Sequence, residues 1–156
     1  MTLEERVVTQ LLEKGFHISC AESCTGGQLA SRIVNVANAS KVLDVSFVTY
    51  ANDAKIKYLG VASDTIDRYN VVSEPVVREM VLGAAKEAGC EVAVATSGVA
   101  GPAGGTKDIP VGTVCFAFLV ADTVTTMTKH FDGLDRNEVR AAATDYALER
   151  LCELLC

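Results

Sequence analysis

The chain has 156 residues, of which 49% are hydrophobic, and a formal net charge of −6 from 14 basic and 20 acidic side chains. This length fits a single domain, residues 1–156, that buries its own core without disulfides or metals. Nucleic acids and anionic membranes would repel a chain of this charge, so the composition argues against both as broad partners.

The first residues, 1–5, are acidic and lack the basic and apolar regions of a secretory signal. No apolar run approaches the roughly 18 residues of a membrane-spanning helix, so we expect a cytoplasmic protein without a membrane partner. None of the six cysteines has Cys-x-x-Cys spacing and there are two histidines. We interpret the thiols as structural and expect no metal and no cofactor. A redox or metal role for Cys20 and Cys24, four residues apart, is the alternative.

Three elements are expected in the first quarter of the chain. Apolar residues at helical spacing predict a helix over 3–14, and Gly15 is suited to end it. The short apolar segment 16–20 predicts a strand. A second helix is expected to begin near Thr25 and to continue to residue 37, because apolar residues again recur on one face.

β-Branched and aromatic residues predict a strand over 42–50. Asn52 is the expected N-cap of the helix that follows, and Gly60 its end. A short helix is expected over 64–69. Ser73, Glu74 and Pro75 then open a longer helix that closes at Gly89.

The last part of the chain alternates a strand, a loop and a hairpin. The apolar run 91–96 predicts a strand covered on both faces, and it leads into the glycine-rich loop 97–106. Segments 111–120 and 123–131 are expected to form an antiparallel hairpin. A C-terminal helix is expected to start at Asp135 with Glu138 in its first turn.

This order of elements predicts an α/β fold, a single three-layer α/β/α domain around a mixed sheet of about five strands. The segment 21–27 and the loop 97–106 both follow the carboxyl ends of predicted strands. Open α/β sheets bind ligands at that edge, so we expect the two loops to face one cleft.

Ser23 is the candidate nucleophile of the segment 21–27. It precedes Gly26 and Gly27, which let a carbonyl approach the backbone closely, and the amides of residues 24–27 are candidate oxyanion donors. The same residues also suit a simple helix cap or an anion-binding turn. We expect Thr25 to be the cap, which leaves Ser23 free.

Lys55 is the candidate base, in the first turn of the helix expected after Asn52. The positive helix end lowers its pKa by less than about one unit, so desolvation must supply most of the shift and the lysine must be buried. A solvated surface lysine is the alternative. Tyr50 is a candidate to orient the lysine or to relay a proton, or else a packing residue.

The loop 97–106 is a candidate phosphate cradle, although it is not a Walker A motif. Arg136 and Arg140, one turn apart on the last helix, are candidate phosphate contacts. Exposed helix arginines without such a role are the alternative.

Four motifs together resemble the CinA C-terminal domain family. They are Ala-Glu-Ser-Cys-Thr-Gly-Gly at 21–27, Thr-Tyr-Ala-Asn-Asp-Ala-Lys at 49–55, Val-Ser-Glu at 72–74 and Ser-Gly-Val-Ala-Gly-Pro at 97–102. The resemblance implies a nicotinamide-nucleotide amidase, which converts nicotinamide mononucleotide and water to nicotinic acid mononucleotide and ammonia in pyridine nucleotide salvage. It also implies a serine–lysine mechanism without a metal.

By this resemblance Ser23 is the nucleophile, Lys55 the general base and Tyr50 the supporting tyrosine. A homo-oligomer, specifically a dimer, is expected. The candidate substrate contacts are Cys24, Thr25, Gly26, Gly27, Asn52, Ser97, Gly98, Gly101, Arg136 and Arg140.

The chain departs from the family pattern at two places. Ala103 stands where the family often has Asp, and Leu134 lengthens the segment before Arg136. Both departures concern substrate contacts. Two other functions stay open, a non-catalytic nucleotide-binding or regulatory module and a redox protein that uses Cys24.

Overall fold

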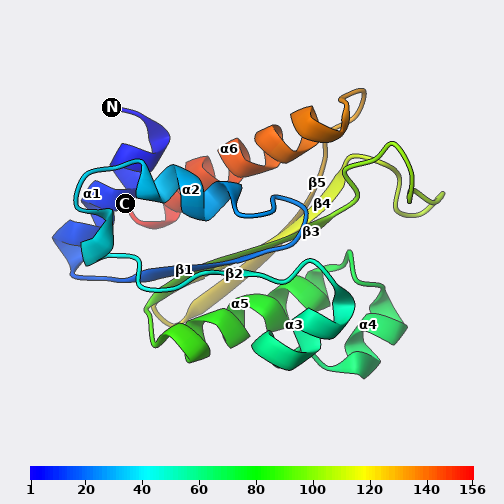
Figure 1. Cartoon of the computed structure of the whole chain (residues 1–156), viewed down its shortest axis with the longest axis horizontal. Helices are drawn as coiled ribbons and strands as arrows, with labels where there is room; N and C mark the ends of the chain where they lie inside the picture. Colours follow the sequence, from blue (N-terminus) through cyan, green and yellow to red (C-terminus); the bar gives the residue numbers. More distant parts are fainter.

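A mixed five-stranded sheet lies between two layers of helices in the computed structural model, which describes residues 1–156 (Figure 1). Helices α1, α2 and α6 cover one face, and α3, α4 and α5 cover the other. The predicted α/β/α fold is therefore confirmed. None of the helices is long and apolar enough to cross a membrane.

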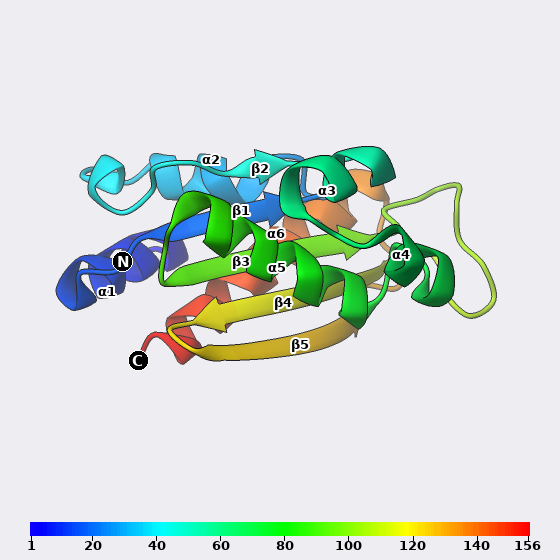
Figure 2. The same ribbon diagram turned by 90° about the horizontal axis from the view of Figure 1, so that it is seen from below.

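The strand order is β2-β1-β3-β4-β5, with β2, β1 and β3 parallel and β4 and β5 antiparallel to their neighbours (Figure 2). The strands are β1 Ile18–Glu22, β2 Phe47–Val48, β3 Val92–Gly98, β4 Thr113–Val120 and β5 Thr123–His130. The helices are α1 Leu3–Lys14, α2 Gln28–Val34, the 3₁₀ helix Ala39–Lys41, α3 Asn52–Leu59, α4 Ser63–Tyr69, α5 Glu74–Ala88 and α6 Arg136–Leu154.

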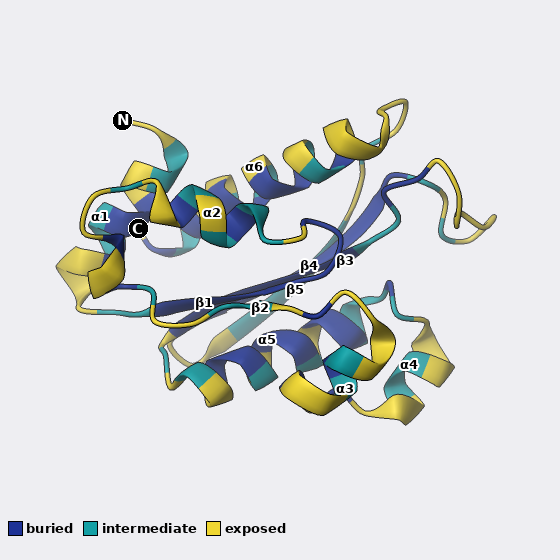
Figure 3. Cartoon of the chain, viewed as in Figure 1, coloured by how far each residue is buried: buried dark blue, intermediate teal, exposed yellow.

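Two hydrophobic cores lie on the two faces of the sheet. Because successive strand residues point to opposite faces, Val92 and Val94 of β3 join the core under α1, α2 and α6, while Ala93 and Ala95 join the core under α5. Figure 3 shows β1 and β3 buried along their length and the helices buried only where they face the sheet. Small side chains on the α5 face allow that helix to lie close.

Local signals placed most helix ends correctly. Gly15 and Gly60 adopt the left-handed conformation that ends α1 and α3. Ser73 accepts a hydrogen bond from the amide of Val76 at the start of α5. Asp135 and Glu138 form the predicted capping box of α6.

Two strand predictions were wrong in extent. β1 spans 18–22 rather than 16–20, because its pairing with β3 continues to the Glu22–Thr96 position. β2 has two residues rather than the predicted 42–50. Before Phe47 the chain pairs with β1 only at a single bridge, between Leu43 and Ile18.

The start of α2 was also predicted wrongly. Gly26 and Gly27 have φ of +57° and +99°, a conformation that cannot continue into a right-handed helix. The helix therefore begins at Gln28 rather than near Thr25, and it ends at Val34 rather than at residue 37.

Helix α3 rests on α5 at Gly83. A Cβ added to Gly83 would lie 1.8 Å from the carbonyl oxygen of Leu59 at the end of α3. Only a residue without a side chain permits this approach. The contact fixes how close α3, which carries Lys55, lies to α5.

Gly83→Ala is expected to lower the free energy of unfolding by about 1–3 kcal/mol, measured by urea denaturation, because the new methyl group must push α3 away. Helix propensity alone would give the opposite sign, a gain of up to about 1 kcal/mol. Lys86→Ala on the exposed side of α5 is the control, with a change within about 0.5 kcal/mol. A more stable Gly83→Ala variant would contradict the close packing.

Candidate active site

The carboxyl ends of β1 and β3 lie side by side, since Glu22 pairs with Thr96. The loop after β1, the end of β2 and the loop after β3 therefore open at one edge of the sheet (Figure 2). The structure thus brings the two loops to one edge, as predicted.

Lys55 and Ser23 meet at this edge. The Lys55 Nζ lies 3.0 Å from the Ser23 Oγ, and the lysine is only 1% exposed. Ala51 is the extended residue before α3, and its carbonyl accepts the first helical hydrogen bond from the Lys55 amide. Asn52 is thus the first helical residue and not the N-cap that was predicted. The lysine is buried, as the hypothesis of a catalytic base requires.

The polar partners of Lys55 are all neutral. Its Nζ donates to the carbonyl oxygens of Thr49 at 2.7 Å and of Tyr50 at 3.1 Å, and it forms no ion pair. Burial lowers the pKa of Lys55 from 10.5 to about 8. A neutral amine has two N–H groups, which the two carbonyls accept, so its lone pair is left for the hydroxyl proton of Ser23.

The loop that follows Ser23 presents free amide groups. The amide of Gly26 donates to the carbonyl of Ser23, whereas the amides of Cys24, Thr25 and Gly27 have no partner within the chain. Three of the four predicted oxyanion donors are therefore free to bind a developing negative charge.

Arg140 braces the same loop from α6. Its Nε donates to the carbonyl of Cys24 at 2.8 Å and its Nη2 to the carbonyl of Thr25 at 3.3 Å. A Cβ at Gly26 would lie 2.9 Å from the Arg140 Nη2, so the turn and the arginine fit each other. Arg140 thus contacts the loop itself rather than lining the pocket beside it.

The cap of α2 is Glu22, not Thr25. The Glu22 carboxylate accepts from the amides of Leu29 and Ala30, and the Thr25 hydroxyl donates to that carboxylate. Sequence reasoning missed Glu22 because it looked for a cap within the loop. The available signal was an acidic residue at the end of an otherwise apolar segment.

Tyr50 contacts Lys55 through its main chain. Its carbonyl accepts from the lysine, while its side chain is 61% exposed and its hydroxyl accepts from the Arg136 Nη2 at 2.9 Å. The Nη1 of Arg136 donates to the carbonyl of Gly101 at 2.7 Å. The Tyr50 ring therefore does not orient Lys55 as expected but joins the end of β2, through Arg136, to the loop after β3.

A pocket of about 270 Å³ lies between these groups. Of the predicted site residues, its lining includes Cys24, Tyr50, Gly98, Gly101 and Arg136. Ala103, one of the two departures from the family pattern, lines it as well.

The other predicted contacts do not line this pocket; they are Thr25, Gly26, Gly27, Asn52, Ser97 and Arg140. The Ser97 hydroxyl is buried and donates to the carbonyl of Val71, so it is not free for a phosphate. Asn52 is exposed at the start of α3, and its side chain makes no hydrogen bond. Leu134, the second departure, lines a neighbouring pocket of about 490 Å³ that shares Arg136.

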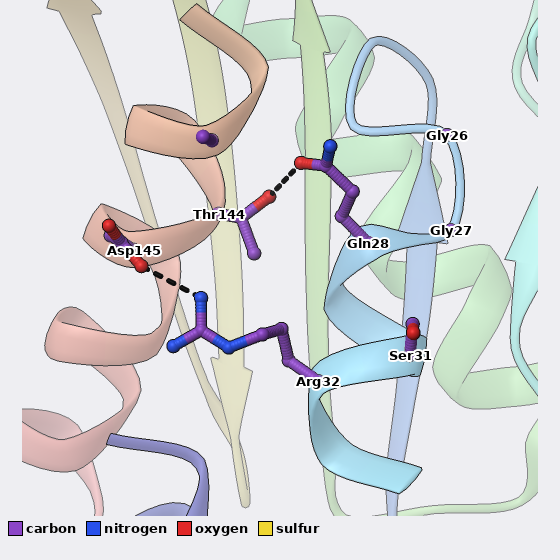
Figure 4. A pocket seen from close by; sticks show the side chains of 8 residues that line it. Gly26, Gly27, Gln28, Ser31, Arg32, Thr144 and Asp145 are labelled. Carbon is purple, nitrogen blue, oxygen red and sulfur yellow. Dashed lines mark hydrogen bonds and ion pairs between the residues drawn. The ribbon is translucent and has the colours of Figure 1, made fainter. Parts of the chain in front are cut away.

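A further hollow of about 500 Å³ lies between α2 and α6 (Figure 4). Its volume is close to that of the pocket lined by Leu134 and nearly twice that of the pocket lined by Cys24. Gly26 and Gly27, two of the predicted substrate contacts, line it.

Ser23 and Lys55 line none of these three pockets. The pocket of about 270 Å³ adjoins the pair, because Cys24 follows Ser23 in the chain and the carbonyl of Tyr50 accepts from Lys55.

The charges at the site favour an anion. Arg136 and Arg140 bind main-chain carbonyls and form no ion pair with a carboxylate. Their positive charges are therefore not neutralised, although the chain as a whole carries −6. Guanidinium groups of this kind suit a phosphate.

Cys24 is a poor candidate nucleophile. Burial raises the pKa of its thiol to about 11, which disfavours the reactive thiolate. This environment counts against the alternative of a redox protein that uses Cys24.

Comparisons with known proteins agree with the geometry. The family model described as the CinA C-terminal domain matches residues 1–155. The nicotinamide-nucleotide amidohydrolase PncC of Escherichia coli K12 is 46% identical over 152 residues, 97% of this chain and 92% of that protein. A putative competence-damage inducible protein of Caldicellulosiruptor saccharolyticus is 43% identical, and the chain spans 36% of its length.

Solved structures show the same fold. The competence/damage inducible protein CihA of Agrobacterium tumefaciens has a TM-score of 0.94 at 38% identity, covering 97% of this chain and 93% of that one. A CinA superfamily protein of Escherichia coli has a TM-score of 0.94 at 38% identity, with 97% and 88% covered. The family model, the relatives and the solved structures lead to one conclusion, that the chain belongs to the CinA C-terminal domain family.

Proposed function

We propose that the chain is a nicotinamide-nucleotide amidase, which hydrolyses nicotinamide mononucleotide to nicotinic acid mononucleotide and ammonia. The observation that carries this proposal is the 3.0 Å contact between the buried Lys55 Nζ and the Ser23 Oγ. The proposal is also supported by a relative, because the chain is 46% identical to the Escherichia coli protein that is named for this activity.

In the proposed reaction Lys55 takes the Ser23 proton and the Ser23 Oγ attacks the carboxamide carbon. The free amides of the loop stabilise the oxyanion of the tetrahedral intermediate. The C–N bond then breaks, and ammonia leaves with the proton that Lys55 held. Water hydrolyses the acyl-enzyme by the same proton transfers, which releases the carboxylic acid and restores Ser23.

The substrate phosphate is assigned to the pocket beside Arg136. This guanidinium lines the pocket and forms no ion pair with a carboxylate. Arg140 acts there through the loop that it braces. A nucleotide-binding module without catalysis would use the same charges, so only turnover separates the two functions.

The proposal includes the cytosol as the compartment and a homodimer as the assembly. β5 supports the second point, because it is a terminal strand of the sheet whose side chains are largely half-exposed. An unpaired strand edge is a common place for a second copy to bind.

Ser23→Ala is expected to lower ammonia release from nicotinamide mononucleotide by at least roughly 10³-fold, because the Ser23 hydroxyl is the only side chain hydrogen-bonded to the Lys55 amine. The measurement is a coupled ammonia assay. Ser31→Ala, at an exposed position on α2, is the matched control and keeps its activity. Undiminished turnover in Ser23→Ala would refute the serine mechanism, and nucleotide binding without turnover in the wild type would favour the non-catalytic module.

The pH dependence is expected to follow Lys55. Only the neutral amine accepts a proton, so kcat/KM should rise with pH and level off above about 8. A profile that is flat from about pH 6.5 to 9 would contradict a lysine base.

The same ionisation affects stability. The unfolded chain binds the Lys55 proton up to its ordinary pKa of 10.5, whereas the folded chain releases it at about 8. The unfolding free energy of the wild type, relative to Lys55→Met, should therefore rise between these two pH values and level off above them. Urea denaturation at several pH values measures this difference without any substrate.

Arg136→Gln is expected to raise the KM for nicotinamide mononucleotide by roughly 10- to 100-fold with a smaller change in kcat, because a charge-assisted phosphate contact is lost. Nicotinamide riboside, which has no phosphate, is the matched substrate. Its kcat/KM should change less than that of the nucleotide. Equal losses for both substrates would rule out a phosphate contact.

A further inference from the structure

A carboxylate that the proposed reaction does not use precedes the nucleophile in the chain, at the end of β1. Glu22 is 0% exposed and forms no ion pair. Its Oε1 accepts from the Thr25 Oγ1 at 2.7 Å and from the Leu29 amide at 2.9 Å, and its Oε2 accepts from the Ala30 amide at 3.1 Å. Three donors thus replace the water that the buried carboxylate has lost.

The carboxylate sets the direction of a short hydrogen-bond chain. The Thr25 hydroxyl has one proton, which goes to Glu22, so the Thr96 hydroxyl at 2.9 Å must donate to Thr25. The Ser23 amide is shared between two acceptors of Thr96, the carbonyl oxygen at 3.2 Å and the Oγ1 at 3.3 Å. The chain therefore runs from the Ser23 amide through two threonines to Glu22.

The other end of the arrangement is anchored to α6. The Gln28 Oε1 accepts from the Thr144 hydroxyl at 2.8 Å, and Arg32 donates to Asp145 at 2.8 Å (Figure 4). These contacts hold α2 in place. The two amides of α2 that bind Glu22 therefore occupy fixed positions. Glu22 in turn fixes the position of Thr25 in the loop, because it also accepts from the Thr25 hydroxyl.

We propose that Glu22 is a positioning residue, which holds the main chain of Ser23 in the orientation that points its Oγ at Lys55. The inference rests on the proposed function. Glu22 acts through Thr25 and Thr96 and does not touch the reacting atoms. Both oxygens of Glu22 accept hydrogen bonds. A glutamine at this position would turn its NH₂ group, which is a donor, toward one of the three donors, so only a carboxylate satisfies all three.

The first test is Glu22→Gln. We expect kcat for nicotinamide mononucleotide to fall by roughly 10²-fold with KM little changed, because a small displacement of the Ser23 Oγ is enough to slow its attack by that factor. The apparent pKa of about 8 in the rate profile should stay, since Glu22 is not a cause of the Lys55 shift. A changed profile would assign Glu22 to proton transfer and overturn the proposal.

The second test uses Thr25 as a matched pair. Thr25→Val keeps the shape of the side chain but removes the hydroxyl, and Thr25→Ser restores it. The proposal expects Thr25→Ser to recover most of the kcat that Thr25→Val loses. Equal activity of the two variants would refute the hydrogen-bond chain, and this pair decides the matter if Glu22→Gln does not fold.

A readout without substrate separates this inference from the proposed function. In Glu22→Gln, amide hydrogen exchange should become faster at Ser23, Leu29 and Ala30 while α5 is unchanged. Thr2→Ala, which removes the cap of α1, is the control and should leave those three amides unaffected. Wild-type exchange rates at all three amides in Glu22→Gln would overturn the proposal. A wild type that does not hydrolyse the nucleotide would refute the function alone.

Discussion

The burial of one amine is the constraint on which the rest of the site depends. A lysine that is 1% exposed loses the hydration of its charge, and burial lowers its pKa to about 8. Two main-chain carbonyls and the Ser23 hydroxyl are the only polar partners that it gains. The same burial that makes Lys55 costly to protonate makes it suitable as a base near neutral pH.

This constraint explains features that otherwise look unrelated. The strand β2 ends at Val48, and the carbonyls of the next two residues, Thr49 and Tyr50, accept from the amine. Helix α3 starts at Asn52, three residues before Lys55. A start one residue earlier or later would rotate the lysine by about 100°. Gly83 then allows α3 to lie against α5. A glycine far from Ser23 in the sequence thus permits the close packing of the helix that carries the base.

The arginines of α6 combine two roles. One turn apart, Arg136 and Arg140 bind carbonyls of the loops after β3 and β1, respectively. Because carbonyls satisfy their donors without neutralising them, the two arginines hold the loops together and keep positive charge at the pocket. An acidic chain can therefore offer a local site for an anionic nucleotide.

Local signals and long-range contacts were not equally predictable from the sequence. Helix ends at Gly15 and Gly60 followed from their own residues, and the order of elements was enough for the fold. The length of β2 was not predictable, because it depends on pairing with β1. The cap of α2 was missed because it comes from Glu22 on a strand, and the contact between Tyr50 and Arg136 joins residues 86 positions apart.

The proposed mechanism depends most directly on the ionisation of Lys55. Nuclear magnetic resonance of lysine side chains in the ligand-free protein measures it, with Lys55→Met to assign the signal. A lysine base requires a pKa of about 8 for the Lys55 amine. A value of 10.5 or higher would show an ammonium that stays charged beside Ser23, and it would contradict the role of Lys55 as the base.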